Sequence, residues 1–382
     1  MRHIYYIGFY FYTTDNLPNE KRTFSSAAVN LMNFISEKLS EKFYVTILSP
    51  SWTKQNSGFF TPKKVSINKY LDLELPPSIG SDSFLIKSFS KLLSQLWLLK
   101  KILILVKKDD KVLVYHSIAN SPAILIAKFL IRFKIILQLN EIYQDVNTLG
   151  TFNNFFENVI INKADAYILS TKLLVKRVSK FNRKFSVCEG VLKLNRIINE
   201  KYADGKIHLV YAGLIDKKKL CAFNAIDIAS SLSENYVIHI IGFGSKADID
   251  DLLARIENNN LKNKCKIYYD GFLEGENLFL FLQKCHIGLV AQSEDKKFTE
   301  SSFPSKIYTY LTNNLIVVCL ENELILSSPV CNLLYRYNFN SPELIAHLIA
   351  DIDLKINHIE LYRDQFSSIE NSFKEELYEL IG

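Results

Sequence analysis

Short apolar runs alternate with longer segments of helical periodicity along most of the chain. In the first half, apolar runs lie at residues 3–11, 44–48, 112–115, 135–139 and 166–169. In the second half, they recur at 207–211, 237–241, 266–269, 287–291 and 315–319, with helices expected at 222–233, 247–257, 275–284 and 304–311. Nearly continuous apolar strands with helices between them are typical of parallel sheets that are covered on both faces.

The pattern therefore predicts an α/β protein with two Rossmann-like domains, because 382 residues exceed what one hydrophobic core usually supports. We place the first domain at residues 1–190 and the second at 200–356, joined by a polar linker at 189–206. A helical tail, residues 357–382, is expected to pack back on the first domain. The two parallel sheets should face a central cleft, which is the default ligand site of such a pair.

Composition narrows the class of protein. Apolar residues make up 48% of the chain and charged residues 23%, as in globular proteins. The net charge of +6 suits an anionic ligand or an anionic membrane surface, and it is too small to imply nucleic acid. The six cysteines show no CxxC spacing, so we expect reduced thiols and neither disulfides nor zinc.

One basic, apolar segment, residues 84–108, is the best membrane candidate. Its longest uncharged run, 92–99, is far shorter than the roughly 20 residues that span a bilayer. Lys87, Lys91, Lys100 and Lys101 interrupt it, so it is either an interfacial helix or a core helix with lysines on its wet side. The aromatic N-terminus does not resemble a signal peptide. We therefore expect a cytoplasmic protein, peripheral on the inner face of the cell membrane if this helix binds lipid.

The decapeptide SFPSKIYTYL at 302–311 carries the strongest chemical signal, since it lies between two apolar runs. Ser302 can cap a helix, Pro304 fits its first turn, and Lys306 adds a positive charge beside the free backbone N–H groups. This combination predicts a phosphate site at the carboxyl edge of a parallel sheet. An ordinary capped helix is the alternative.

Dinucleotide and nucleotide fingerprints are weak. IGFGS at 241–245 contains GxG, but it follows the second strand of its domain and lacks the third glycine. There is no Walker A sequence and no GxSxG. The two DxD strings, 248–250 and 351–353, fall in helical contexts, so no metal site is expected.

The ordered fragments YAGLID (211–216), IIGFGS (240–245), YYDGFL (268–273), HIGLV (286–290) and SFPSKIYTYL resemble GT-B fold retaining glycosyltransferases. Within these, the chain is similar to the family 4 type that builds bacterial capsule and O-antigen. LQLNEIY at 137–143 and ADAYILST at 164–171 extend the resemblance to the first half.

The resemblance implies that the second domain binds a nucleotide-diphosphate sugar, a UDP-sugar rather than a GDP-sugar, without cofactor or metal. The acceptor would be a saccharide or a polyprenyl-linked saccharide. The implied donor-binding residues are Gly213, Lys219, Gly242, Gly244, Phe272, Leu273, Ser302, Ser305, Lys306 and Thr309. For Lys219, a solvated lysine run at 217–219 is the alternative interpretation.

The chain departs from the family pattern at its acidic signature. Thr309 stands where the family has a ribose-binding glutamate, and Glu300 lies one residue from the position of the other glutamate. The resemblance implies a catalytic role for Glu300 at the donor sugar, with an exposed loop acid as the alternative. A threonine hydroxyl binds a ribose as a neutral partner, and more weakly than a carboxylate.

On the acceptor side, the resemblance implies catalytic roles for Glu141 and His116, which each follow a first-domain strand. His116 could also be a purely structural residue. Three rival functions stay open: a GT-B sugar-nucleotide epimerase, a non-catalytic homologue that serves as a partner subunit, and a nicotinamide-dependent oxidoreductase. The missing fingerprint disfavours the third.

Overall fold

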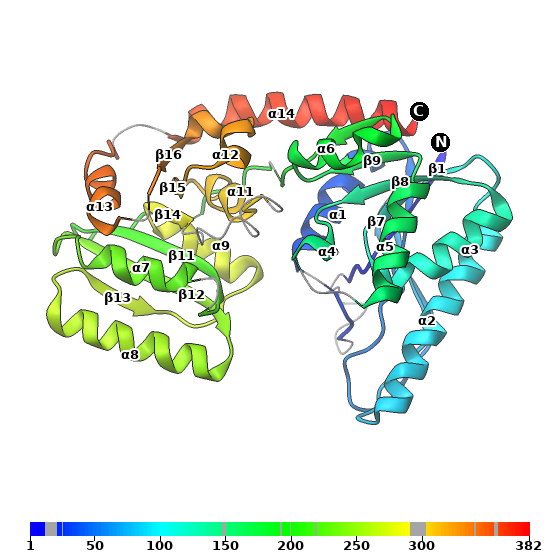
Figure 1. The fold of residues 1–382 in the computed structure, drawn as a ribbon, viewed down its shortest axis with the longest axis horizontal. Helices are drawn as coiled ribbons and strands as arrows, with labels where there is room; N and C mark the ends of the chain where they lie inside the picture. The colour runs from blue at the N-terminus through cyan, green and yellow to red at the C-terminus, as the bar shows by residue number, and fades with distance from the viewer. Residues whose placement is uncertain are drawn as a thin grey trace. The chain divides into compact units, whose positions relative to one another are not determined.

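The computed structural model describes the 382 residues except 12–20, 25, 147–149, 192, 199, 218–219, 291–302, 340 and 355–357. The chain forms two compact units, Met1–Val191 with Phe373–Gly382, and Leu192–Ser372. Each unit is built on its own sheet with helices on both faces (Figure 1). The expected α/β architecture with parallel sheets is confirmed.

The first unit contains an eight-stranded sheet in the order β10-β9-β8-β7-β1-β2-β5-β4. Neighbouring strands are parallel except β4, which pairs antiparallel with β5. Its strands are β1 His3–Ile7, β2 Tyr44–Leu48, β4 Lys63–Asn68, β5 Leu71–Leu75, β7 Lys111–Tyr115, β8 Lys134–Leu139, β9 Ala166–Leu169 and β10 Phe185–Val187. A separate two-stranded sheet joins β3 Phe59–Phe60 and β6 Ser78–Ile79.

Helices cover both faces of this sheet because its strands are apolar on both sides. Tyr5 and Ile7 pack with the inner residues of α2, α3 and α5, whereas Ile4 and Tyr6 pack with α1 and the end of α14. The helices are α1 Ser26–Ser40, α2 Phe84–Leu105, α3 Ser121–Ile131, α4 Tyr143–Val146, α5 Thr151–Lys163, α6 Leu173–Val178 and α14 His358–Ile381. Short 3-10 turns occur at Ile118–Asn120 and Ser179–Phe181.

The last turns of α14 belong to the first unit. Phe373 stacks on Phe34 of α1 with ring centroids 5.9 Å apart, and the Tyr378 hydroxyl donates to the Lys38 carbonyl over 2.9 Å. Arg2 donates to the carbonyl of Ile381 over 2.9 Å. The expected tail began at residue 357, but the part of α14 up to Ser372 clusters with the second unit.

The second unit contains a fully parallel six-stranded sheet in the order β13-β12-β11-β14-β15-β16. In chain order this is 3-2-1-4-5-6, the arrangement of doubly wound nucleotide-binding folds. Its strands are β11 Ile207–Ile215, β12 Tyr236–Gly244, β13 Lys266–Tyr269, β14 Ile287–Val290, β15 Ile316–Leu320 and β16 Leu334–Tyr337. Its helices are α7 Cys221–Ala229, α8 Lys246–Lys262, α9 Gly275–Lys284, α11 Lys306–Leu311, α12 Glu323–Ser327 and α13 Pro342–Ala350, with a 3-10 turn at Cys331–Leu333.

The structure differs from the sequence-based elements in several places. β11 and β12 run for nine residues each, further than the expected 207–211 and 237–241. The stretch between β2 and α2, where the apolar pattern above predicts no strand, contains β3 to β6. α11 begins at Lys306, two residues later than expected. Among the described helices, none combines the length and the apolar character needed to cross a bilayer.

Candidate functional site

The order of the second sheet reverses between β11 and β14, and ligands of such sheets bind at the carboxyl ends of the strands at this reversal. Gly213, near the end of β11, and Lys306, the first residue of α11, meet there. The Lys306 ammonium donates to the Tyr211 hydroxyl over 2.9 Å and lies 4.0 Å from the centroid of that ring. The structure thus joins two of the predicted donor-binding residues.

The close approach of the Lys306 side chain to β11 requires a glycine at position 213. A Cβ atom at position 213 would lie 2.3 Å from the Lys306 Nζ and 2.4 Å from its Cε. The residue also has φ +155°, a backbone conformation that side chains disfavour. Glycine therefore allows the half-buried Lys306 ammonium group to lie directly against the backbone at the end of the strand.

Lys306 is held in place by the packing of α11 against the sheet. The Tyr310 hydroxyl, fully buried, accepts from the Ala212 backbone N–H over 2.8 Å. Its ring fits because residue 288 is glycine, whose Cβ would lie 2.4 Å from the ring. α11 has only six residues, and Ser305 at its start makes no side-chain capping bond. The positive charge here comes mainly from the lysine and not from a long helix dipole.

Gly242 and Gly244 lie inside β12, opposite Gly213 and Ile215 of β11. A Cβ at position 242 would lie 1.8 Å from the Gly213 carbonyl oxygen, and one at position 244 would lie 2.3 Å from the Ile215 oxygen. These glycines permit the two strands to run together to their ends. Their contribution to a ligand site is therefore indirect.

An aromatic pair borders this edge. Phe243 and Phe272 are 55% and 54% exposed and meet edge to face, with centroids 5.4 Å apart and planes at 87°. The Gly242 N–H donates to the Gly271 carbonyl over 2.9 Å, which ties the loop of Phe272 to β12. Leu214 is partly exposed opposite Phe243, and Leu273 is half-buried. Together these residues make an apolar platform at the carboxyl ends of β12 and β13, on the same sheet edge as Lys306 and Gly213.

Phe243 did not emerge from the sequence as a site residue, whereas Phe272 did. The available signal was the large aromatic between the two glycines of IGFGS, at the end of a strand. A single exposed aromatic would need no explanation, but two that contact each other at a strand edge are a candidate ligand surface.

Thr309 lies one turn after Lys306 on α11, half-buried. Its hydroxyl donates to the Ser305 carbonyl over 3.4 Å. It is not part of the hydrophobic core, and it shares a helix face with Lys306. Three other predicted residues, Lys219, Glu300 and Ser302, lie outside the described residues.

In the first unit, Glu141 follows β8 at the carboxyl edge and is half-buried. Its backbone carbonyl lies 3.2 Å from Nδ1 of His116, which follows β7. The side chain before Glu141 is also fixed, because the Asn140 amide donates to the Tyr115 hydroxyl over 2.9 Å. The structure thus brings the two predicted acceptor-side residues together, with the His116 ring against the backbone carbonyl of Glu141.

His116 is only 2% exposed, and its ring stacks on Tyr143 with centroids 5.0 Å apart. Burial lowers the pKa of His116 to about 4, so the imidazole is neutral at physiological pH. Its Nε2 lies 3.6 Å from the fully buried Glu157, whose carboxylate accepts from the Tyr143 and Gln144 N–H groups. This environment favours a role in positioning the Glu141 segment over direct contact with a substrate.

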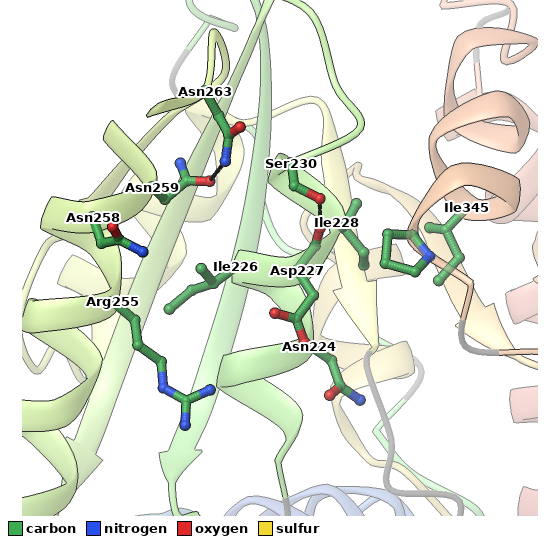
Figure 2. A pocket seen from close by; sticks show the side chains of 11 residues that line it. Asn224, Ile226, Asp227, Ile228, Ser230, Arg255, Asn258, Asn259, Asn263 and Ile345 are labelled. Carbon is green, nitrogen blue, oxygen red and sulfur yellow. Dashed lines mark hydrogen bonds between the residues drawn. The ribbon is translucent and has the colours of Figure 1, made fainter. Parts of the chain in front are cut away.

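A separate cavity of about 640 Å³ lies on the helical side of the second unit, between α7, α8 and α13 (Figure 2). It contains none of the predicted site residues. Asp227 and Arg255 contribute its charged groups, and burial raises the pKa of Asp227 against the opposing effect of Arg255. Most of the remaining polar lining consists of asparagine amides. Within the described part of the chain, no group of three or more His, Cys, Asp or Glu side chains could hold a metal ion.

No protein-family model matches the sequence, and a search of curated proteins returns no match. Solved structures do match over essentially the whole chain. The apo structure of OtsA aligns with a TM-score of 0.67 at 11% identity, covering 100% of this chain and 98% of OtsA. A UDP-forming α,α-trehalose-phosphate synthase from Burkholderia vietnamiensis aligns with a TM-score of 0.65 at 9% identity, covering 99% and 98%.

Anabaena Alr3699/HepE, solved in complex with UDP, aligns with a TM-score of 0.61 at 10% identity, covering 99% of this chain and 100% of that chain. These likenesses show the fold. The chain has the GT-B glycosyltransferase fold, with two Rossmann-like units.

Proposed function

We propose that the protein is a glycosyltransferase that moves a sugar from a nucleotide-diphosphate sugar to a saccharide or polyprenyl-linked acceptor. The donor is a UDP-sugar, and the reaction retains the anomeric configuration and needs no metal. The enzyme would be of the family 4 type and act in bacterial surface polysaccharide synthesis.

The observation that carries this proposal is the pairing of Lys306 with Gly213 at the strand-order reversal, with the Phe243–Phe272 platform at the carboxyl ends of β12 and β13 on the same sheet edge. A cation held against a glycine backbone suits a diphosphate, and an exposed aromatic pair suits a nucleotide base. The fold adds support, because the similar trehalose-phosphate synthases are named as UDP-forming and HepE was solved with UDP.

The chemistry follows from the charge of Lys306. Cleavage of the glycosidic bond leaves negative charge on the departing diphosphate, and a preorganised ammonium stabilises that charge in the transition state. Lys306 is held by Tyr211 before any ligand arrives, so little reorganisation is needed. For a retaining enzyme, we expect attack from the front face, with a donor phosphate oxygen taking the acceptor proton.

On the acceptor side, Glu141 is the proposed contact, and His116 is proposed to hold its backbone. We also assign Lys219 and Ser302 to donor binding, and Glu300 to a catalytic role at the donor sugar. The roles of these three rest on the sequence resemblance alone.

Thr309 favours a second candidate function. Because a neutral hydroxyl replaces the ribose-binding carboxylate of the resembled family, the chain could be a non-catalytic homologue that acts as a partner subunit. A GT-B sugar-nucleotide epimerase is a further alternative, which would alter the nucleotide sugar without any acceptor.

Calorimetry with UDP tests the proposal directly. The wild-type protein should bind UDP, and Lys306→Ala should weaken binding by about 1.5–3 kcal/mol because a charge-assisted hydrogen bond is lost. Lys264→Ala is the matched control, since Lys264 is an exposed lysine of the same unit that lies 3.5 Å from Glu234, outside the proposed site.

Equal affinity of wild type and Lys306→Ala, or no binding of any nucleoside diphosphate by wild type, would contradict the donor site. Product analysis then separates the alternatives. Sugar transfer to an acceptor supports the transferase, an altered nucleotide sugar without an acceptor supports the epimerase, and UDP binding without either reaction supports the partner subunit.

A further inference from the structure

Helix α2 of the first unit carries polar residues on much of its buried side and apolar residues on its exposed side. Its buried residues are Ser90, Ser94, Leu98 and Ile102, which recur every four residues on one side. The buried serines are satisfied locally: Ser90 lies 3.0 Å from the Ser78 hydroxyl, and Ser94 donates to the Lys91 carbonyl. The inward side of the N-terminal half is therefore polar.

The opposite side of α2 is apolar and exposed to solvent. Five large residues, spaced 4, 3, 4 and 7 apart, fall within roughly 60° of the helix circumference at 100° per residue. These residues, here called the α2 stripe, are Leu85, Phe89, Leu92, Leu96 and Leu103. Leu85 is 76% exposed and even Leu103 is 41% exposed, so the stripe contributes little to the core.

α3 extends this apolar surface. α2 and α3 bury their inner sides against the same face of the sheet, so their outer sides point away from it together. The outer side of α3 carries Ile126, Phe129 and Leu130, and Phe129 is 83% exposed. Soluble monomers rarely expose a continuous apolar surface of this kind without a partner.

The charges around this surface identify the partner. α2 and α3 contain no aspartate or glutamate, and the only acid of neighbouring α5 is Glu157, which is fully buried. Lys100, exposed, lies about 20° beyond the edge of the α2 stripe on the helix circumference. In a second copy of the chain, the same helices would offer Lys100 no carboxylate partner. An anionic lipid surface complements both the lysine and the apolar side chains.

We propose that the α2 stripe and the outer side of α3 insert into the interface of an anionic lipid bilayer, with α2 parallel to the membrane plane. This changes the surface expected from the sequence. Lys87 lies 3.8 Å from Asp82, Lys101 lies 2.6 Å from Glu74, and Lys91 lies over the Trp52 ring. These lysines lie toward the body of the unit. The exposed leucines and phenylalanines of α2 and α3 therefore make the main contact with the bilayer.

Vesicle co-sedimentation of the full chain tests this proposal without nucleotide. Vesicles of phosphatidylcholine mixed with phosphatidylglycerol should bind the protein more tightly than phosphatidylcholine alone. Leu92→Gln/Leu96→Gln should lower the partition coefficient by at least about tenfold, because two side chains lose their apolar burial. Lys100→Gln should lower it by roughly fivefold at low salt and by less at high salt.

The matched control is Leu253→Gln/Leu261→Gln, two exposed leucines on α8 of the second unit, which should bind like wild type. Circular dichroism and thermal melting establish that each variant folds. Unchanged binding of folded Leu92→Gln/Leu96→Gln would overturn the proposal. The proposal would also be overturned if the wild-type protein bound neither vesicle type. It would be overturned as well if light scattering showed a wild-type dimer that Leu92→Gln/Leu96→Gln converts to monomer.

Discussion

Two neighbouring glycines in the second unit serve different purposes, although they are paired in the sheet. Gly213 faces the Lys306 side chain, whereas Gly242 faces the Gly213 carbonyl. A lysine can rotate away from a new methyl group, but a backbone carbonyl within a strand cannot. The same substitution should therefore affect ligand binding at one position and folding at the other.

We expect Gly213→Ala to weaken UDP binding about tenfold by displacing Lys306, with a modest loss of stability of about 1–3 kcal/mol from backbone strain. Gly242→Ala should destabilise the second unit by more than the roughly 1–3 kcal/mol typical of overpacking. Calorimetry and urea denaturation of both variants measure the two effects. Equal effects of both variants on affinity and on stability would argue against this division.

His286, at the start of β14, should make the stability of the protein depend on pH. Its Nδ1 accepts from the His208 backbone N–H over 3.0 Å, which requires a neutral ring. Burial and the charge of Lys201 lower the pKa of His286 from 6.5 to about 4. The unfolded chain then binds a proton that the native state does not between these values, so this contribution is complete above pH 6.5 and is lost as the pH falls toward 4.

His286→Asn preserves an acceptor close to the position of Nδ1 but cannot titrate. The free energy of unfolding of this variant should therefore fall less than that of wild type between pH 6.5 and pH 4. His347→Asn on the surface of α13 is the control and should follow wild type. Parallel curves for His286→Asn and wild type would show that the ring is not kept neutral by the fold.

At the scale of elements, α11 combines the cation and the departure from the family pattern. Lys306 and Thr309 are three residues apart, so their side chains lie on neighbouring positions of one helix face. The Thr309 hydroxyl donates a long hydrogen bond to the Ser305 carbonyl. A carboxylate at this position would reach the same side as the lysine.

If UDP binds beside Lys306, Thr309→Glu should maintain or strengthen its binding, because a carboxylate accepts from two ribose hydroxyls. Thr309→Val should weaken it by roughly 0.5–1.5 kcal/mol. Calorimetry of both variants beside wild type decides the matter. Identical affinities in all three proteins would remove Thr309 from the ribose site and favour the partner-subunit interpretation.

Much of the architecture could be predicted from the sequence because parallel strands leave continuous apolar runs. The ends of β11 and β12 could not, since Gly213, Gly242 and Gly244 read as turn residues while the structure uses them for close strand contact. The family resemblance implied both Lys306 and Gly213 as donor-binding residues, and the structure brings them together. Phe243 was missed because exposure at a strand end depends on the neighbouring loop, which periodicity does not report.

The outer surface of α2 shows another limit of sequence reasoning. The lysines predicted a basic face, because charged residues usually mark the wet side of a helix. In the structure, Ser90 and Ser94 take the inner positions, and the apolar stripe faces outward. Only the position of the sheet identifies which side of such a helix is inside.

At the scale of the whole molecule, the two units have separate cores, so their unfolding can be followed separately. The inner residues of the first sheet and of the second sheet belong to different clusters. Both tryptophans, Trp52 and Trp97, lie in the first unit, and therefore tryptophan fluorescence reports that unit alone. Circular dichroism reports the helices of both.

UDP should then stabilise one unit selectively. At 100 times its dissociation constant, a ligand of the second unit adds about 2.7 kcal/mol to the stability of that unit. In urea, this should shift part of the circular dichroism transition to higher concentration and leave the fluorescence transition in place. Leu377→Ala removes a fully buried side chain at the end of α14 and should lower the free energy of unfolding of the first unit by about 2–5 kcal/mol. The fluorescence transition should therefore move to lower urea concentration. Leu252→Ala, buried in α8, is the matched change in the second unit and should lower only the component that UDP raises. If UDP moves both transitions equally, and each leucine variant does as well, the chain unfolds as one cooperative body and the two units are not independent in stability.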